Sequence, residues 1–294
     1  MRSGTVALIG RSNVGKSTLL NRLLGEKVSI VSNKPQTTRR RILGVVHRPD
    51  VQIGILDTPG LHEPKHRLNA RMVRTALDTL DEADILYLVT DATSGSPARD
   101  RAVIREVERA VAGRARPVFL VINKADAVAK PALLPMLAAF DKVHAWTAMV
   151  PVSAKSGDNL DRLLAVTEGV LPNAEPLYAE DTLTDQSMRA LAADLIREHV
   201  LHRTYEEVPH AVAVEIDEFR EEGRLARIAA TILVEREAHK AIIIGERGER
   251  LKEVGSRARV EMEQLFGMKV FLQLWVKVRE AWREDDQALV ELGY

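Results

Sequence analysis

The chain has 294 residues, of which 46% are hydrophobic and 29% charged, a composition typical of a globular protein with about two domains. Its 42 basic and 42 acidic residues cancel, so any contact with a polyanion must come from a local patch, and the absence of cysteine excludes disulfides, thiolate metal sites and cysteine nucleophiles. The first apolar run is too short for a signal peptide, and no run reaches the eighteen or so apolar residues of a membrane span, so we expect a cytoplasmic protein.

Apolar strands alternate with amphipathic helices from Thr5 to about Pro172. The predicted strands are TVALIG, RILGVVH, VQIGILD, DILYLVTD, PVFLVIN and MVPVS, and most of them are continuous apolar runs. Such runs are expected where both faces of a sheet are covered by helices. The pattern therefore predicts an α/β fold, a doubly wound and mostly parallel sheet, over residues 1–172.

A loop poor in hydrophobic side chains, GRSNVGKST, follows the first predicted strand and precedes a helix marked by leucines. It matches the phosphate-loop pattern G-x-x-x-x-G-K-S, whose backbone N–H groups and helix N-terminus face a polyphosphate. Lys16 would reach the outer phosphates and Ser17 would bind Mg²⁺. A serine-capped glycine turn is the alternative, but the flanking strand and helix favour nucleotide binding. The predicted nucleotide contacts here are Gly10, Asn13, Val14, Gly15, Lys16, Ser17 and Thr18.

The tetrad DTPG, Asp57 to Gly60, closes the third predicted strand. Because Mg²⁺ between phosphates needs further oxygen ligands, we expect Asp57 to hold it directly or through water. Gly60 would present a backbone N–H to the terminal phosphate. Alone the tetrad is typical of many turns, but its place after a phosphate loop favours a nucleotide site.

Two further strand ends predict the base. In NKAD, which contains Asn123, Lys124 and Asp126, the Asp126 carboxylate would accept two hydrogen bonds from donors on the edge of guanine, whereas adenine presents a different pattern. In SAK, Ser153, Ala154 and Lys155 end the next strand, where a backbone N–H would bind the guanine carbonyl. Either motif alone is an ordinary polar strand end, but together and in order they favour a guanine nucleotide over adenine.

The stretch LPNAEPLYAEDTLTDQS contains two prolines and several acids, breaks the alternation of strands and helices, and predicts a linker over residues 173–187. After it, residues 188–294 show the order α-β-β-α-α-β, with the glycine loop GERG, Gly245 to Gly248, between two helices. Set in that order, the loop resembles a KH domain of the bacterial type (type II, α+β), whose loop clamps single-stranded RNA. A solvated helix with ion pairs is the alternative for this charged segment. The predicted RNA contacts are Gly245, Glu246, Arg247, Gly248, Arg250 and Lys252, and Ile242 to Ile244, Leu251 and Val254 are expected to line a groove for bases.

These four nucleotide motifs resemble signature elements of the translation-factor-related GTPases. The fifth element of that family is a threonine in a mobile loop, which would be Thr37 or Thr38, and we favour Thr38 as a Mg²⁺ ligand that is released on hydrolysis. With this resemblance, Lys16, Thr38 and Gly60 form the predicted catalytic set. Leu61 stands where small GTPases carry the glutamine that orients water, so hydrolysis should be slow without a partner, a cation or another side chain. Asn13 matches a position that helps to hold K⁺ in cation-dependent relatives.

Over nearly its full length the chain resembles bacterial ribosome-assembly GTPases with one G domain and a C-terminal KH domain. The resemblance implies binding to the 3′ end of 16S rRNA, a role in 30S subunit biogenesis, GTP or GDP as ligand, and a monomer. It also implies peripheral contact with the inner face of the cell membrane, although no long basic amphipathic helix stands out. The alternative hypothesis is a nucleotide-sensing RNA-binding module in which GTP turnover is incidental.

Overall fold

The computed structural model describes residues 1–294 and divides into two compact units. The first unit comprises Met1–Ser29, Thr38–Glu63 and Met72–Asp185, and the second comprises Ile30–Thr37, Pro64–Arg71 and Gln186–Tyr294. Two short segments of the N-terminal half are thus grouped with the second unit by their contacts. The domain boundaries given above at residues 172 and 188 stay a prediction.

The first unit is built on a sheet of six strands in the order β2-β3-β1-β4-β5-β6. Its strands are β1 (Arg2–Ile9), β2 (Ile42–Arg48), β3 (Val51–Asp57), β4 (Ile85–Asp91), β5 (Val118–Asn123) and β6 (Ala148–Pro151). All neighbours pair in parallel except β2 and β3, which are joined by a tight turn and pair antiparallel. The predicted mostly parallel sheet is confirmed, and each predicted strand forms.

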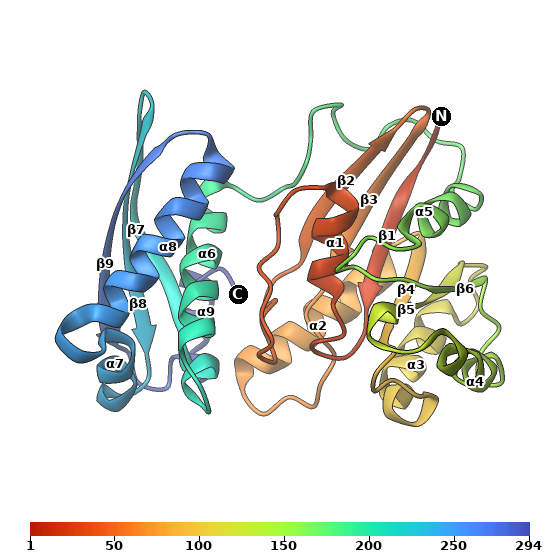
Figure 1. Cartoon of the computed structure of the whole chain (residues 1–294), viewed down its shortest axis with the longest axis horizontal. Helices are drawn as coiled ribbons and strands as arrows, with labels where there is room; N and C mark the ends of the chain where they lie inside the picture. Colours follow the sequence, from red (N-terminus) through yellow and green to blue (C-terminus); the bar gives the residue numbers. More distant parts are fainter. The chain divides into compact units, whose positions relative to one another are not determined.

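Helices cover both faces of this sheet (Figure 1). On one face α1 (Lys16–Leu24) and α5 (Leu160–Glu168) bury leucines against β1, β3 and β4. On the other face lie α2 (Arg67–Glu82), α3 (Pro97–Val111) and α4 (Lys130–Asp141), which share a second apolar cluster with the strands. Because both faces are covered, the strands carry the continuous apolar runs seen in the sequence.

The parallel pairing also places the site. The carboxyl ends of parallel strands lie along the same edge of a sheet, and loops at that edge meet at the point where strand order reverses. Here β1 runs into the phosphate loop, β3 ends at Asp57, β5 ends at Asn123 and β6 precedes Ser153. The four predicted nucleotide motifs therefore share one edge of the sheet.

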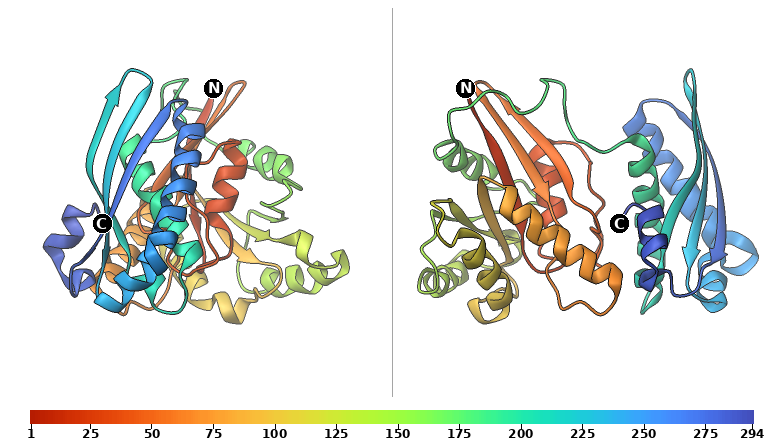
Figure 2. Two further views of the ribbon diagram at one scale, coloured as in Figure 1. Left: turned by 60° about the vertical axis from the view of Figure 1, so that its left-hand side comes forward. Right: turned by 180° about the vertical axis from the view of Figure 1, so that it is seen from behind.

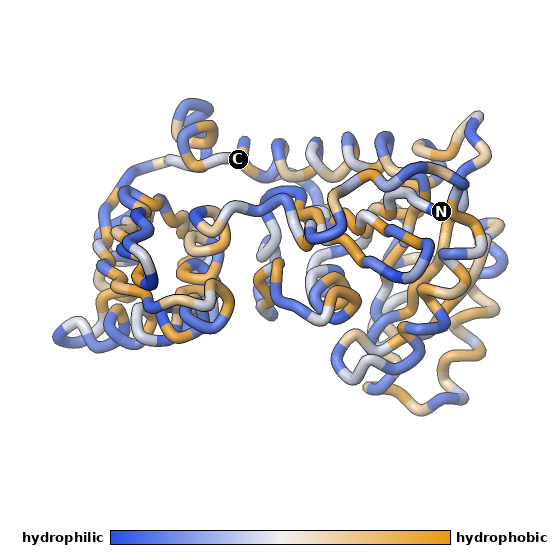
Figure 3. Tube along the Cα trace, turned by 90° about the horizontal axis from the view of Figure 1, so that it is seen from above, coloured by the Kyte–Doolittle hydropathy of each residue, from blue (hydrophilic) through white to orange (hydrophobic).

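The second unit contains a sheet of three strands in the order β7-β8-β9, with helices packed on one of its faces (Figure 2). Its elements are α6 (Met188–Arg203), β7 (Ala213–Glu222), β8 (Leu225–Val234), α7 (Glu237–Ile244), α8 (Glu249–Phe266) and β9 (Lys269–Val278). β7 pairs antiparallel with β8, whereas β9 pairs parallel with β8. The predicted order α-β-β-α-α-β is present. Hydrophobic and hydrophilic stretches are interspersed along the whole trace (Figure 3).

A C-terminal segment beyond the predicted order adds a short turn, η4 (Trp282–Glu284), and the helix α9 (Asp286–Glu291). Trp282 is fully buried, and its indole N–H donates to the Ala211 carbonyl at 3.0 Å. Asp285 caps α9 by accepting from the N–H groups of Gln287 and Ala288. This cap followed by a helix is the sequence signal that would have predicted the segment. No helix of the chain combines the length and apolar character needed to cross a membrane.

Candidate functional site

The phosphate loop leaves the end of β1 and turns into α1 through Gly15, which has a φ of +96°. A side chain at Gly15 would meet the Asn123 amide nitrogen at 2.2 Å, and one at Gly10 would meet the Val89 carbonyl oxygen at 2.4 Å. Both places therefore require glycine, because the backbone comes too close to its neighbours for a Cβ atom. α1 begins at Lys16, so its free N–H groups point into the loop.

Lys16 is buried inside this loop without an anionic partner in hydrogen-bond range. Its ammonium donates only to the carbonyl oxygens of Gly10, at 3.2 Å, and Arg11, at 3.1 Å. Burial lowers the pKa of Lys16 to about 8, although the nearby Asp57 carboxylate raises it in part. A phosphate group would supply the negative charge that this ammonium lacks.

Three oxygen-bearing side chains meet beside Lys16. The Ser17 hydroxyl lies 2.7 Å from that of Thr38 and donates to Asp57 Oδ2 at 2.6 Å, and the Thr38 hydroxyl lies 3.3 Å from the same carboxylate oxygen. The other carboxylate oxygen, Oδ1, is buried and has no hydrogen-bond partner. Burial raises the pKa of Asp57, and Lys16 and the hydroxyl donors oppose that shift. A buried oxygen without a partner next to two hydroxyls fits a hard cation such as Mg²⁺.

The two candidate threonines differ in their surroundings. The Thr38 hydroxyl points to Ser17 and Asp57, whereas the Thr37 hydroxyl donates to the Lys34 carbonyl at 2.8 Å and lies 2.8 Å from the Ser32 hydroxyl. The structure thus brings Thr38, and not Thr37, to the oxygen cluster. This arrangement supports the choice of Thr38 as the Mg²⁺ ligand.

The loops predicted to hold the base are braced against the phosphate loop. The Asn123 amide donates to the Val14 carbonyl at 2.9 Å and accepts from the Ala154 N–H at 2.9 Å. The Lys124 ammonium donates to the Asn13 carbonyl at 2.8 Å. These bonds fix the relative positions of the three loops, so that a base and its phosphates can be held together.

Two of the side chains predicted to contact the base, those of Asp126 and Lys155, are open to solvent. Ser153 and Ala154 are buried at the end of β6. The carboxylate of Asp126 is therefore open to donors from a ligand. Gly60 and Thr18 lie on the DTPG turn and on α1 beside the oxygen cluster, and Leu61 donates its N–H to the Gly10 carbonyl at 3.2 Å. The Leu61 side chain offers no polar atom, so it cannot orient water.

Two residues that support the site, Ser29 and Asp100, were not predicted from the sequence. The Ser29 hydroxyl donates to Asp57 Oδ2 at 3.0 Å, and Asp100 accepts from Arg11 at 2.6 Å and from Thr90 at 2.6 Å. Ser29 orients the Asp57 carboxylate, and Asp100 links the phosphate loop to α3. Neither residue belongs to a short motif, and only the folded chain places them, so the sequence offers no signal for them.

The second unit carries its own candidate site at the glycine loop. The loop turns through Gly245, Arg247 and Gly248, all with positive φ, and α8 starts directly after it. Arg250 does not point freely outward, because its guanidinium donates to the Ile242 carbonyl. Glu246 and Arg247 are exposed, and Lys252 lies one helical turn farther along α8.

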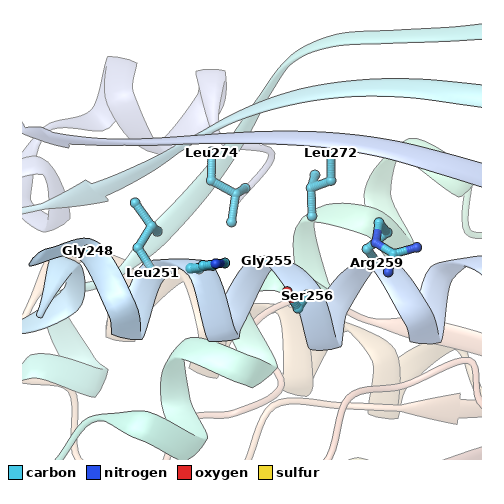
Figure 4. A pocket seen from close by; sticks show the side chains of 8 residues that line it. Gly248, Leu251, Gly255, Ser256, Arg259, Leu272 and Leu274 are labelled. Carbon is cyan, nitrogen blue, oxygen red and sulfur yellow. The ribbon is translucent and has the colours of Figure 1, made fainter.

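A groove of about 380 Å³ runs from this loop between α8 and β9 (Figure 4). It is lined by Gly248, Leu251, Lys252, Gly255, Ser256, Arg259, Leu272 and Leu274. Leu272 and Leu274 of β9 thus face α8, on which the small residues Gly255 and Ser256 lie between the two cations Lys252 and Arg259. Of the apolar residues expected to line a groove, only Leu251 does so. Ile243 and Val254 are buried in the core instead, since they face the sheet.

Comparisons with known proteins identify a GTPase domain and a KH domain in this chain. A family model described as 50S ribosome-binding GTPase matches residues 5–124, and a KH domain model matches residues 207–283. The GTPase Era of Geobacter metallireducens is 48% identical over the whole chain and 98% of its own length. Era of Xanthomonas axonopodis pv. citri is also 48% identical, over the whole chain and 97% of its own length.

Solved structures show the same relationship. A variant of Aquifex aeolicus Era bound to GDP and AlF₄⁻ has a TM-score of 0.96 and 44% identity, covering 100% of this chain and 99% of that one. A structure of Era with MgGDPNP and nucleotides 1506–1542 of 16S ribosomal RNA has a TM-score of 0.95 and 44% identity, with the same coverage. The predicted relationship is therefore confirmed, and the chain belongs to the Era family of GTPases.

Proposed function

We propose that this GTPase binds Mg²⁺ and GTP at the strand-end site, binds the 3′ end of 16S rRNA through the groove of its second unit, and assists assembly of the 30S subunit. The observation that carries the proposal is the oxygen cluster of Ser17, Thr38 and Asp57 beside a buried Lys16, in a chain that also has a KH groove. The Era structure with MgGDPNP and a 16S rRNA fragment supports the same pair of ligands for a relative.

The residues divide the work of binding and hydrolysis. The Lys16 ammonium and the N–H groups at the start of α1 hold the phosphates, and the buried Gly60 N–H faces the terminal one. Ser17, Thr38 and Asp57 would hold Mg²⁺. An ion held by these three residues would neutralise charge on the phosphate oxygens.

In this proposal the Thr38 hydroxyl would join Mg²⁺ only while the terminal phosphate is present. The segment Ile30–Thr37, which directly precedes it, is grouped with the second unit by its contacts. We infer that hydrolysis releases this loop and so resets the RNA-binding state. The catalytic set Lys16, Thr38 and Gly60 stays part of this proposal, as do the base contacts from Asn123 to Asp126 and Ser153 to Lys155.

Replacing Thr38 and Thr37 by alanine, each in a separate variant, tests whether Thr38 is the residue that responds to the terminal phosphate. In Thr38→Ala we expect affinity for a GTP analogue with Mg²⁺ to fall about tenfold or more, because one contact to a charged site is lost. Affinity for GDP should stay at the parent value. Thr37→Ala is the matched control, since its hydroxyl bonds only within its own loop, and it should keep both affinities. Equal losses in the two variants, measured by calorimetry, would refute the assignment of Thr38.

The glycine loop gives a second test. In Arg247→Asp we expect affinity for single-stranded RNA to fall about tenfold, and its salt dependence to weaken, because a cation that faces phosphate becomes an anion. Nucleotide affinity should not change. Arg257→Asp is the control, because it makes the same charge change on α8 outside the groove, where Arg257 pairs with Glu253 at 3.0 Å. Retention of full RNA affinity by Arg247→Asp would assign RNA binding to another surface.

Leu61 favours a second candidate function, a nucleotide-sensing RNA-binding module in which turnover is incidental. The two functions differ in how hydrolysis responds to partners. We propose that K⁺, held with the help of Asn13, and the small subunit complete the site in a monomeric cytoplasmic protein. Hydrolysis should then be faster in K⁺ than in Na⁺ and faster still with small subunits. A rate unaffected by either would favour the pure binding module.

A further inference from the structure

The edge strand β9 carries an unusual row of side chains on the face of the sheet that no helix covers. Its inward residues, Val270, Leu272, Leu274 and Val276, belong to the core of the second unit. Its outward residues are all exposed: Lys269, Phe271, Gln273, Trp275 and Lys277. We call these five residues the outer row.

The two rings of the outer row are the most exposed phenylalanine and tryptophan of the chain. Phe271 is 46% exposed and Trp275 is 45% exposed, whereas every other Phe and Trp is buried or half-buried. Burial of such rings is normally favourable by a few kcal/mol each, roughly 1.5–3 for a phenylalanine. Two of them left in water on one strand therefore indicate a surface that is covered in a complex.

The charge of the outer row favours an anionic partner. It contains two lysines and no acid, and the Arg227 guanidinium from β8 lies 5.5 Å from the centre of the Phe271 ring. Lys269 also pairs with Glu263 of α8 at 3.6 Å, whereas Lys277 has no ion pair. The backbone of β7, which carries the acids on this side of the sheet, lies two strands away, at about 10 Å, although the Glu222 side chain reaches Arg227 on the middle strand at 2.8 Å. Two of those acids are already ion-paired, Glu218 with Arg220 and Glu222 with Arg227. Rings flanked by cations are the combination that binds single-stranded nucleic acid by stacking and phosphate contact.

The outer row is also continuous with the groove. Leu272 and Leu274 of the same strand line the groove on the helix side (Figure 4), and Phe271, Gln273 and Trp275 alternate with them on the other side. Because β9 is the last strand of its sheet, no further strand blocks the way around it. An RNA strand that leaves the groove can therefore pass over the edge and meet the outer row.

We propose that the outer row is a second contact for single-stranded RNA, in which Phe271 and Trp275 stack on bases and Lys269 and Lys277 approach phosphates. The proposal rests on the proposed RNA binding of the groove, which it extends by several nucleotides. Phe271 and Trp275 lie four residues apart along a strand, about 13 Å. Each ring therefore takes a separate base.

Oligonucleotide length tests the proposal with the full chain. A tetranucleotide fills only a KH groove, whereas an unstructured strand of about twelve nucleotides reaches beyond it. In the double variant Phe271→Ala with Trp275→Ala, affinity for the long strand should fall about fivefold or more for each ring removed. Affinity for the tetranucleotide should not change. Trp275→Phe keeps a stacking surface and should retain most of the affinity, and Leu134→Ala, which truncates another exposed apolar side chain, should have no effect.

Trp275 fluorescence gives a readout that a general loss of folding would not reproduce. In a Trp146→Phe background, the long strand should quench the fluorescence of the exposed Trp275 indole and the tetranucleotide should not.

Equal affinity of the parent and the double variant for the long strand overturns the proposal. A changed sedimentation coefficient of the RNA-free double variant also overturns it, because the outer row would then be an interface between copies of the chain. If neither oligonucleotide binds the parent chain, the proposed function of the groove fails instead.

Discussion

Replacing Lys16 by alanine is expected to abolish measurable GTP turnover, with a loss of at least about 10²–10³-fold, the effect of removing one donor to the charge that develops on phosphate. Lys16 is buried, donates only to two loop carbonyls, and has a pKa lowered to about 8 by that burial. Burial of this ammonium without an anionic partner is therefore unfavourable, and a bound phosphate would stabilise it. The measurement is single-turnover hydrolysis with radiolabelled GTP.

The control for this variant is Lys142→Ala, which removes an exposed lysine at the end of α4. It should hydrolyse GTP at the parent rate. Thermal unfolding of both variants separates catalytic loss from misfolding, because Lys16 also donates two hydrogen bonds to the phosphate loop. A folded Lys16→Ala chain with parent turnover would remove the phosphate-loop assignment.

Replacing Asp126 by asparagine is expected to exchange guanine for xanthine specificity. Two hydrogen bonds to a charged acceptor, at roughly 1.5–3 kcal/mol each, correspond to a loss of about 10²–10⁴-fold in GTP affinity. Xanthine presents a carbonyl where guanine has an amino group, so the asparagine amide can donate where the carboxylate accepted. Asp126 is exposed in the short turn Ala125–Ala127 that follows β5, so the change should leave the fold intact.

Competition between GTP and XTP for the same site measures this exchange. Asp141→Asn, at an exposed acid at the end of α4, is the matched control and should keep the parent preference. Unchanged GTP affinity in Asp126→Asn would show that the carboxylate does not read the base. The test distinguishes base recognition from phosphate binding, because Lys16 and the phosphate loop are untouched.

Local patterns in the sequence were sufficient to predict the sheet and the motifs on it. Continuous apolar runs marked the strands, and parallel pairing then placed Asp57, Asn123 and Ser153 at one edge of the sheet without further information. Thr38 could not be separated from Thr37 by spacing, because adjacent residues in a loop differ only in which way their side chains turn. The folded loop turns the Thr38 hydroxyl toward Asp57 and the Thr37 hydroxyl toward Lys34.

Contacts between residues far apart in the sequence could not be predicted from these local patterns. Asp100 reaches Arg11 across 89 positions, and the groove is formed by α8 with Leu272 and Leu274 of β9, whereas the sequence pattern favoured neighbours of the glycine loop such as Ile243. Helical spacing alone does not show which face of α7 meets the sheet. The buried Ile243 shows that the apolar face of α7 belongs to the core and not to the groove.

The central claim is that the strand ends of the first unit enclose a magnesium-bound guanosine triphosphate. Titration calorimetry of the full chain with a non-hydrolysable GTP analogue, in Mg²⁺ and then in EDTA, tests it most directly, with the matching ATP analogue as competitor. We expect one binding event per chain that weakens when Mg²⁺ is removed and that excess ATP analogue does not displace. Binding that is absent, insensitive to Mg²⁺, or equally strong for the two analogues would contradict the claim.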